Sequence, residues 1–224
     1  MNSTISYDNK SYLRIPIKTH ILTSDDDMVT VVQKYTKDIL QPRDYIVISE
    51  SPLAITQGRA IAQEQIKVGL LAKILWRFVS KVPYGIGLRE PTSMQCAIDE
   101  VGHLRILLAA LGGGLGKIVG KKGWFYRIAG KQAALIDAAN TSPVPPYNRC
   151  VIKGPKDPDK IAQQICDICG CETVIMDIND IGGSWVIGRS SSVDPHLLEA
   201  VMKDNPQGQA DELTPICIVR ESDA

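Results

Sequence analysis

The sequence has few aromatic residues, no excess of either charge and no long apolar run. Phe, Trp and Tyr together make up 5% of its 224 residues, which argues against surfaces that stack nucleic-acid bases. Lys and Arg number 25, as do Asp and Glu, so the whole chain lacks the basic field that attracts nucleic acid or anionic lipid. We therefore expect neither a nucleic-acid partner nor a membrane partner.

Secretion and membrane-spanning signals are also missing from the pattern. The first eight residues are polar and lack the apolar core of a signal peptide. The most apolar region, residues 104–120, is interrupted by several glycines and by Lys117, and it is too short and too glycine-rich to span a bilayer. Six cysteines without a secretion signal are typical of reduced thiols. We expect a cytoplasmic protein.

Two familiar kinds of site find no support in the sequence. The three histidines are isolated, and no motif pairs a Ser or Cys nucleophile with a base, so hydrolysis by a catalytic triad is not indicated. Cys166, Cys169 and Cys171 lack a fourth ligand at the spacing of a zinc or iron–sulfur site. Because Cys166 and Cys169 share a helical apolar face with Ile165 and Ile168, we interpret these thiols as buried.

Hydrophobic patterning predicts a mixture of strands and helices around a globular core. Strands are expected at residues 12–18, 45–49, 124–128, 150–153, 174–176, 185–188 and 216–219. Helices are expected at residues 28–39, 60–80, 94–111, 158–169 and 195–203. Ser24 or Asp25 is a candidate N-cap for the first helix, and Asp157 followed by Pro158 starts the fourth. The strand at 45–49 opens into polar residues and a helix, where α/β folds place ligands.

A glycine run at residues 112–117 suggests a phosphate loop at first sight. It departs from the Walker pattern because Leu111 stands where the first glycine belongs and Ile118 replaces the Ser or Thr. We expect a flexible loop near a binding cleft, and a plain solvated loop is the alternative. Its candidate anion contacts are Lys117, Lys121 and Lys122.

The stretch from Val174 to Ser184 carries the most specific chemistry. A β-branched run ends in Asp177 and Asp180, and two glycines follow. Carboxylates at the end of a rigid strand, beside a glycine turn, can hold a hard divalent cation. A solvated turn capped by Asp and Asn is the alternative interpretation.

These segments, in this order and at this spacing, resemble the coenzyme F420-0:γ-glutamyl ligase family. The family motifs are Leu-Pro, Gly-Asp-Asp-Leu, an apolar strand followed by Glu-Gly-Arg, Gly-Ile-Asp-Ala-Ser-Asn, an Asp-Pro-Asp helix start and Ser-Asp-Thr-Asn-Gly-Arg. Their counterparts here are Ile15-Pro16, Asp26-Asp27, Tyr45–Arg59, Ile136–Asn140, Lys156–Asp159 and Asn179–Gly183. The resemblance implies an α+β fold of mixed sheets with flanking helices, in an intertwined homodimer. We expect one domain over residues 1–224, with an unaligned helical and glycine-rich insert at about 81–130.

The resemblance also implies an activity and the residues that carry it. Family members use GTP and a divalent metal, Mg²⁺ or Mn²⁺, to join L-glutamate in amide linkage to a carboxylate acceptor such as coenzyme F420-0. By resemblance, Asp137 and Asp180 are metal ligands. The residues expected to contact the nucleotide are Ile15, Pro16, Glu50, Ser51 and Asn140. The partners implied are therefore small molecules and a second copy of the chain.

The chain departs from the family pattern at three positions that matter for phosphate binding. Ile55 stands where the family has a lysine, and Ser184 stands where it has an arginine. Ile181 replaces the threonine that follows the second metal-binding aspartate. An apolar side chain cannot replace a point charge on phosphate, so weak GTP affinity is predicted. The alternative function is a non-catalytic relative that binds a nucleotide or another anionic metabolite.

Overall fold

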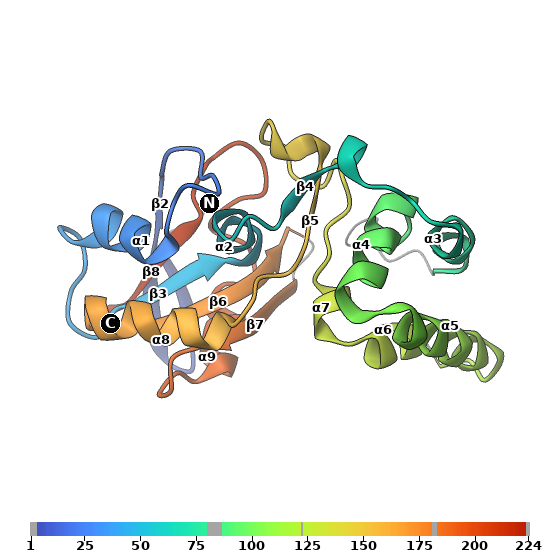
Figure 1. The fold of residues 1–224 in the computed structure, drawn as a ribbon. Helices are drawn as coiled ribbons and strands as arrows, with labels where there is room; N and C mark the ends of the chain where they lie inside the picture. Colours follow the sequence, from blue (N-terminus) through green and yellow to red (C-terminus); the bar gives the residue numbers. More distant parts are fainter. Residues whose placement is uncertain (1–3, 80–86, 122, 181–182, 223–224) are drawn as a thin grey trace. The chain divides into compact units, whose positions relative to one another are not determined.

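The computed structural model describes residues 4–79, 87–121, 123–180 and 183–222. The chain divides into two compact units. The first, Met1–Gly58 with Pro155–Ala224, is called the sheet unit here. The second, Arg59–Gly154, is called the helical unit. Mixed sheets with flanking helices confirm the predicted α+β class (Figure 1).

The sheet unit is built on a mixed six-stranded sheet with the order β1-β2-β8-β3-β6-β7. Its strands are β1 (Thr4–Tyr7), β2 (Lys10–Ile17), β3 (Tyr45–Ser49), β6 (Glu172–Asn179), β7 (Gly183–Arg189) and β8 (Ile216–Ser222). Only β3 and β6 pair in parallel; the other neighbours are antiparallel. The strands expected at 12–18, 45–49, 174–176, 185–188 and 216–219 are thus confirmed, with shifted ends.

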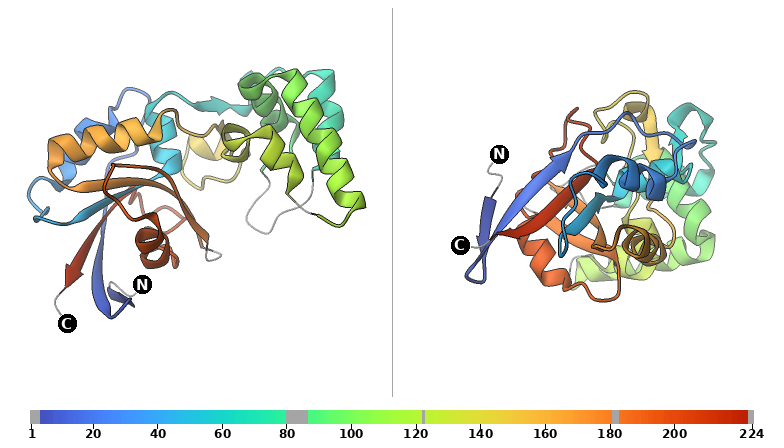
Figure 2. Two further views of the ribbon diagram at one scale, coloured as in Figure 1. Left: turned by 90° about the horizontal axis from the view of Figure 1, so that it is seen from below. Right: turned by 90° about the vertical axis from the view of Figure 1, so that its left-hand side faces the viewer.

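Helices cover both faces of this sheet, as Figure 2 shows. They are α1 (Met28–Thr36), α2 (Glu50–Thr56), α8 (Pro158–Cys169) and α9 (Pro195–Val201). Val47, Val174 and Cys217 point from one face into a core shared with Leu198 and Val201 of α9. The alternate strand residues, such as Ile46 and Ile175, are also fully buried, because side chains of a strand point alternately to its two faces.

The helical unit contains a two-stranded ribbon and a cluster of helices. Its elements are β4 (Ala60–Ala62), η1 (Gln63–Gln65), α3 (Leu70–Leu75), η2 (Trp76–Phe78), α4 (Pro91–Val101), α5 (His103–Ile118), α6 (Trp124–Ala129), α7 (Lys131–Ala134), η3 (Tyr147–Arg149) and β5 (Cys150–Ile152). Met94, Ile98 and Ile106 are among the buried residues of its core.

The helix predicted at residues 60–80 is confirmed only in its second half, where α3 and η2 cover residues 70–78, and it is wrong for residues 60–69. Residues 60–62 form β4, which pairs antiparallel with β5 through Ala60–Ile152 and Ala62–Cys150. The segment then turns through η1, and α3 begins only after Gly69. Residues 60–62 pair with residues about ninety positions away. This tertiary contact outweighs the local helical pattern, because intrinsic helix propensity is a weak preference.

The helix predicted at 94–111 is interrupted and longer than expected. Gly102 has a φ of +86° and separates α4 from α5, a conformation that glycine adopts without steric cost. Gly112, the residue after the predicted helix end, lies inside α5, which continues to Ile118. No single helix in the described ranges is long and apolar enough to cross a bilayer. Helices α4 and α5, which are bent by 118° relative to each other, reach the required length and apolar composition only when they are taken together.

Helix α5 also corrects the prediction of a flexible loop at residues 112–117. The glycines are helical, and a Cβ built on Gly116 lies 2.7 Å from the Lys121 carbonyl oxygen. A Cβ on Gly112 lies 2.2 Å from Ile128 Cδ1. The glycines therefore let the chain around α6 pack closely on α5. The segment 124–128, predicted as a strand, is helix α6, which begins after Gly123.

Candidate functional site

The edge of the sheet where β3 and β6 end gathers the sequence-predicted residues of the sheet unit. Ser49, the last residue of β3, pairs with Met176 of the parallel strand β6, which continues for three more residues to Asn179. Strand β2 ends at the same edge, because Ile17 and Ile48 both pair with Ile216. Ile15, Pro16, Glu50, Ser51 and Asp180 all lie on or just beyond these strand ends. We call this region the carboxyl edge.

Asp180 follows β6 directly and is held by residues from the C-terminal part of the chain. Asn205 Nδ2 donates a hydrogen bond of 2.6 Å to Asp180 Oδ1, and the Asp180 amide donates one of 3.1 Å to Gln209 Oε1. Asn205 is buried, with a left-handed φ of +48°. The buried side-chain amide of Asn205 therefore positions the exposed carboxylate of Asp180. The sequence analysis did not identify Asn205.

The segment after Asn205 also joins the other strands of the carboxyl edge. The Thr19 amide, after β2, donates to the Leu213 carbonyl at 2.9 Å. The Ser49 amide, at the end of β3, donates to the Pro215 carbonyl at 3.0 Å. One segment thus fixes the ends of β2, β3 and β6 relative to one another. Three Asp, Asn or Gln residues in Asp204–Gln207 were the only sequence signal for this role.

Helix α2 places two predicted positions in different environments. Glu50 opens the helix directly after β3 and is mostly buried, with 8% of its surface exposed. An acidic side chain in a first helical turn is favoured by the helix dipole. Ile55 lies in the last turn of α2 and is buried too. An isoleucine thus fills an enclosed position where the family has a lysine.

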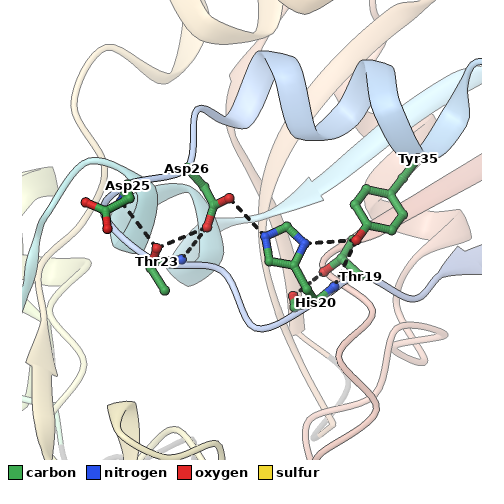
Figure 3. A network of polar contacts seen from close by, with 6 residues as sticks. All are labelled: Thr19, His20, Thr23, Asp25, Asp26 and Tyr35. Carbon is green, nitrogen blue, oxygen red and sulfur yellow. Dashed lines mark hydrogen bonds and ion pairs between the residues drawn. The ribbon is translucent and has the colours of Figure 1, made fainter.

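A polar network after β2 was not anticipated from the isolated histidines (Figure 3). His20 Nε2 lies 2.9 Å from Asp26 Oδ1, and His20 Nδ1 lies 2.9 Å from the Tyr35 hydroxyl. The Thr23 amide donates to Asp26 Oδ2 at 2.8 Å. The hydrogen bonds from His20 and then Thr23 lower the pKa of the Asp26 carboxyl. Asp26 therefore stays ionised and orders the segment that joins β2 to α1.

The neighbouring acids have separate roles. Asp27 is the N-cap of α1, and its Oδ2 accepts a hydrogen bond of 2.8 Å from the Thr30 amide. The predicted caps, Ser24 and Asp25, are wrong by two or three residues. The acids of this segment were expected to cap the helix, and Asp27 is the one that caps α1.

The helical unit holds the other two predicted site residues, Asp137 and Asn140. The backbone of Asp137 forms a two-way bridge with Ile152 of β5, with N···O distances of 2.8 and 3.1 Å. Asn140 is exposed with a φ of +69°, and its amide donates to the Asn148 carbonyl at 3.1 Å. Asp137 is half-buried and belongs to a different unit from Asp180.

A mostly buried cluster of three charged side chains lies near this bridge in the helical unit. Arg59 Nη2 lies 2.8 Å from Glu100 Oε1, and Lys153 Nζ lies 3.4 Å from Glu100 Oε2. Burial alone would raise the pKa of Glu100, but Arg59 and Lys153 outweigh it and the pKa is lowered. Arg59 is the arginine of the predicted Gln-Gly-Arg motif, and its side chain is committed to this cluster.

The carboxylates of Asp137 and Asp180 suit a hard divalent cation by their chemistry. Mg²⁺ in nucleotide sites is commonly held by one or two protein carboxylates, with phosphates and water as the remaining ligands. Within the described ranges no group of three or more His, Cys, Asp or Glu residues could hold a metal ion. Asp137 and Asp180 each supply one carboxylate of this kind, one in each unit.

The thiols show no sign of a metal or nucleophilic role. Cys171 is buried, and Cys166 and Cys169 are half-buried. Burial raises the pKa of all three thiols, which disfavours the reactive thiolate. The expectation that Ile168 packs with them inside is wrong, because its side chain is exposed.

The remaining predicted positions have different outcomes. Ser184 is buried in β7 and donates to the Glu199 carbonyl of α9. Lys117 lies in α5, where its Nζ donates to the Phe78 carbonyl at 2.5 Å. Ile181 and Lys122 lie outside the described residues.

A comparison with family models matches residues 16–184 of the chain to the model described as F420-0:Gamma-glutamyl ligase. The match spans both units and includes the segment 81–130 that the sequence motifs left unaligned. A search of curated proteins gives no match.

Proposed function

Since the chain belongs to the F420-0:γ-glutamyl ligase family, we propose that it joins L-glutamate to a carboxylate acceptor such as coenzyme F420-0, with GTP as the activating nucleotide. The observation that supports the proposal is the carboxyl edge: the family-like Ile15-Pro16, Glu50-Ser51 and Asp180 lie on or just beyond the ends of three strands of one sheet. Strand ends of this kind are where α/β sheets bind nucleotides.

The proposed roles follow the chemistry of each group. Ile15 and Pro16 supply an apolar wall to the nucleotide pocket, and Glu50 and Ser51 supply acceptors for its polar groups. Asn140, by resemblance to the family, supplies a polar contact to the nucleotide. Asp137 and Asp180 hold Mg²⁺ or Mn²⁺, which supplies neutralisation of phosphate charge when bound.

The reaction proceeds in two transfers. A carboxylate oxygen of the acceptor attacks the γ-phosphorus of GTP, and GDP leaves with the electrons of the broken P–O bond. The glutamate amine then attacks the acyl carbon, phosphate leaves, and one proton is lost from nitrogen. Asn205, by its 2.6 Å hydrogen bond, keeps the Asp180 carboxylate in a fixed position on the edge, and such preorganisation costs no rearrangement during the transfers.

A second candidate is a relative that binds a nucleotide or another anionic metabolite without ligation. Two observations favour it. Ile55 is apolar and buried where the family has a phosphate-binding lysine, and Ser184 is bound to the backbone of α9 where the family has an arginine. Loss of both cations removes charge-assisted contacts of about 1.5–3 kcal/mol each.

Mass spectrometry of the products separates the two candidates. Protein incubated with coenzyme F420-0, L-glutamate, GTP and Mn²⁺ should yield an acceptor heavier by one glutamate residue, with GDP in equal amount. Asp180→Asn and Asp137→Asn keep the side-chain size and remove the charge, and each should lower the rate by at least about a hundredfold. Asp167→Asn, on the exposed surface of α8, is the matched control and should leave the rate unchanged.

Calorimetric titration of GTP completes the test. Mn²⁺-dependent binding without product in any acceptor mixture would establish the non-catalytic candidate. Absence of both binding and product would refute both. A homodimer is also proposed, and the mass from light scattering tests it independently of activity.

A further inference from the structure

Helix α5 presents an apolar face to the outside of the helical unit. Its members recur at alternating intervals of four and three residues: Leu104, Leu108, Leu111, Leu115 and Ile118. Between 52% and 83% of the surface of each is exposed. The opposite side of the helix carries the buried Ile106, Ala109 and Gly116, and it faces the core and α6. We call the five exposed residues the α5 face.

Apolar exposure continues on the neighbouring segment. Phe78 is 65% exposed, and its carbonyl accepts the hydrogen bond from Lys117 of α5. Ile74 and Leu70, four and eight residues before Phe78, are exposed as well. Figure 1 shows α5 extending beside α6 in this unit. Large exposed apolar side chains that gather on neighbouring elements mark an interaction site in a folded protein.

The helical unit that carries this surface has a strong excess of positive charge. The helical unit contains fourteen Lys and Arg against five Asp and Glu, an excess of nine positive charges. The sheet unit contains eleven and twenty, an excess of nine negative charges. The sequence between Glu100 and Asp137 has no acid at all and includes Arg105, Lys117 and Arg127. The neutrality of the whole chain therefore conceals a division between its two units.

An apolar helical face on a unit with an excess of nine positive charges fits the surface of an anionic bilayer. Apolar side chains enter the boundary between headgroups and acyl chains, and nearby Lys and Arg contact the headgroups. A second copy of α5 fits less well, because in a symmetric dimer the same surface of each copy faces that of the other. Arg105 and Lys117 would then meet basic residues of the other copy, with no acid in the segment to oppose them.

We propose that the helical unit binds the surface of anionic membranes through the α5 face, with the adjoining basic residues providing attraction to lipid headgroups. Helix α5 lies in the interface instead of spanning the bilayer, since Met94, Ala97 and Ile98 of α4 are buried in the core of the unit and stay there. This places the protein on a lipid surface, in contrast to the expectation drawn from whole-chain charge.

Vesicle flotation with the full chain tests the proposal. The protein should float with phosphatidylcholine vesicles that contain about 30% phosphatidylglycerol and much less with phosphatidylcholine alone. Raising the salt to about 0.5 M should weaken binding by roughly tenfold. Equal binding to neutral and anionic vesicles, or no binding to either, would overturn the proposal.

Variants with matched controls identify the surface. Leu104→Gln, Leu111→Gln and Ile118→Gln combined should weaken binding at least about tenfold. The control combines Ile21→Gln, Ile39→Gln and Ile168→Gln, which are exposed isoleucines of the sheet unit, and should bind as the wild type does. Circular dichroism confirms that each variant is folded.

The charge requirement is tested separately. Lys121→Glu with Arg127→Glu should weaken binding by roughly tenfold, whereas Lys37→Glu with Lys160→Glu, on the sheet unit, should not. Light scattering tests the competing occupant. A wild-type oligomer that dissociates in the α5-face variant, with no vesicle binding, would show that a second copy covers the face and would refute the membrane proposal.

Discussion

Arg59 Nη2 and Glu100 Oε1 lie 2.8 Å apart, with side chains only 10% and 12% exposed. Arg59 Nε also donates to the Gly154 carbonyl at 2.6 Å. Glu100 belongs to the segment 81–130, which the motifs left without a counterpart, whereas Arg59 belongs to a motif that they identified. The pair joins the segment 81–130 to the rest of the helical unit, because Glu100 neutralises an arginine that lies outside that segment.

Replacing Glu100 by Gln should destabilise the protein by roughly 2–4 kcal/mol, because the buried Arg59 and Lys153 lose their counter-charge. The pKa of Glu100 is lowered in the fold, so its contribution is complete above the ordinary pKa of a glutamate. It is lost as the pH falls through the lowered value. In urea unfolding, the free energies of unfolding of wild type and variant should therefore differ strongly at pH 7 and much less near pH 3.

The control for this experiment is a salt bridge on the surface. Lys10 Nζ lies 2.9 Å from Glu221 Oε1, and both side chains are about half exposed. Glu221→Gln should leave the unfolding midpoint nearly unchanged at either pH, because water and salt screen exposed pairs. Equal effects of the two substitutions would contradict the burial argument.

Asp177→Asn should stabilise the protein at neutral pH. Burial raises the pKa of the Asp177 carboxyl on β6, so its ionised form is less favourable in the folded than in the unfolded chain. Stability is lost as the pH rises from the ordinary pKa of an aspartate through the raised value. Thermal unfolding should show a higher midpoint for the variant at pH 7 and the same midpoint near pH 3. A lower midpoint at pH 7 would show that the charge is stabilising.

Two glycines of α5 should respond in opposite ways to alanine. A Cβ on Gly114 meets no atom within 4 Å, so Gly114→Ala should stabilise the protein by about 0.5–1 kcal/mol through helix propensity. A Cβ on Gly116 lies 2.7 Å from the Lys121 carbonyl oxygen, so Gly116→Ala should destabilise it by about 1–3 kcal/mol. Chemical denaturation measures both. Similar values for the pair would favour the loop that was first predicted.

Weak binding of GTP by the wild type is predicted from Ile55. Ile55→Lys should tighten GTP binding by about tenfold through a charge-assisted contact with phosphate, while it lowers the melting temperature because position 55 is buried. Ile55→Met is the control and should change neither quantity much. A tight, Mn²⁺-dependent GTP complex of the wild type in calorimetry would contradict the prediction.

The sequence alone determined the elements whose signals are local. Strand β3 contains the apolar run Tyr45–Ile48, and α8 begins at Pro158 after Asp157 and ends at Cys169, as its pattern predicted. The motif order also identified the family. These features depend on neighbouring residues, so no distant contact was needed to predict them.

Tertiary structure decided the rest, because the deciding contacts join distant positions. Ala60–Ala62 became a strand by pairing with Cys150–Ile152, and the glycines of α5 are helical because α6 packs against them. Asn205 reached Asp180 from 25 residues away. The opposite net charges of the two units are visible only once the structure divides the chain, because the two charges cancel in the net charge of the whole sequence.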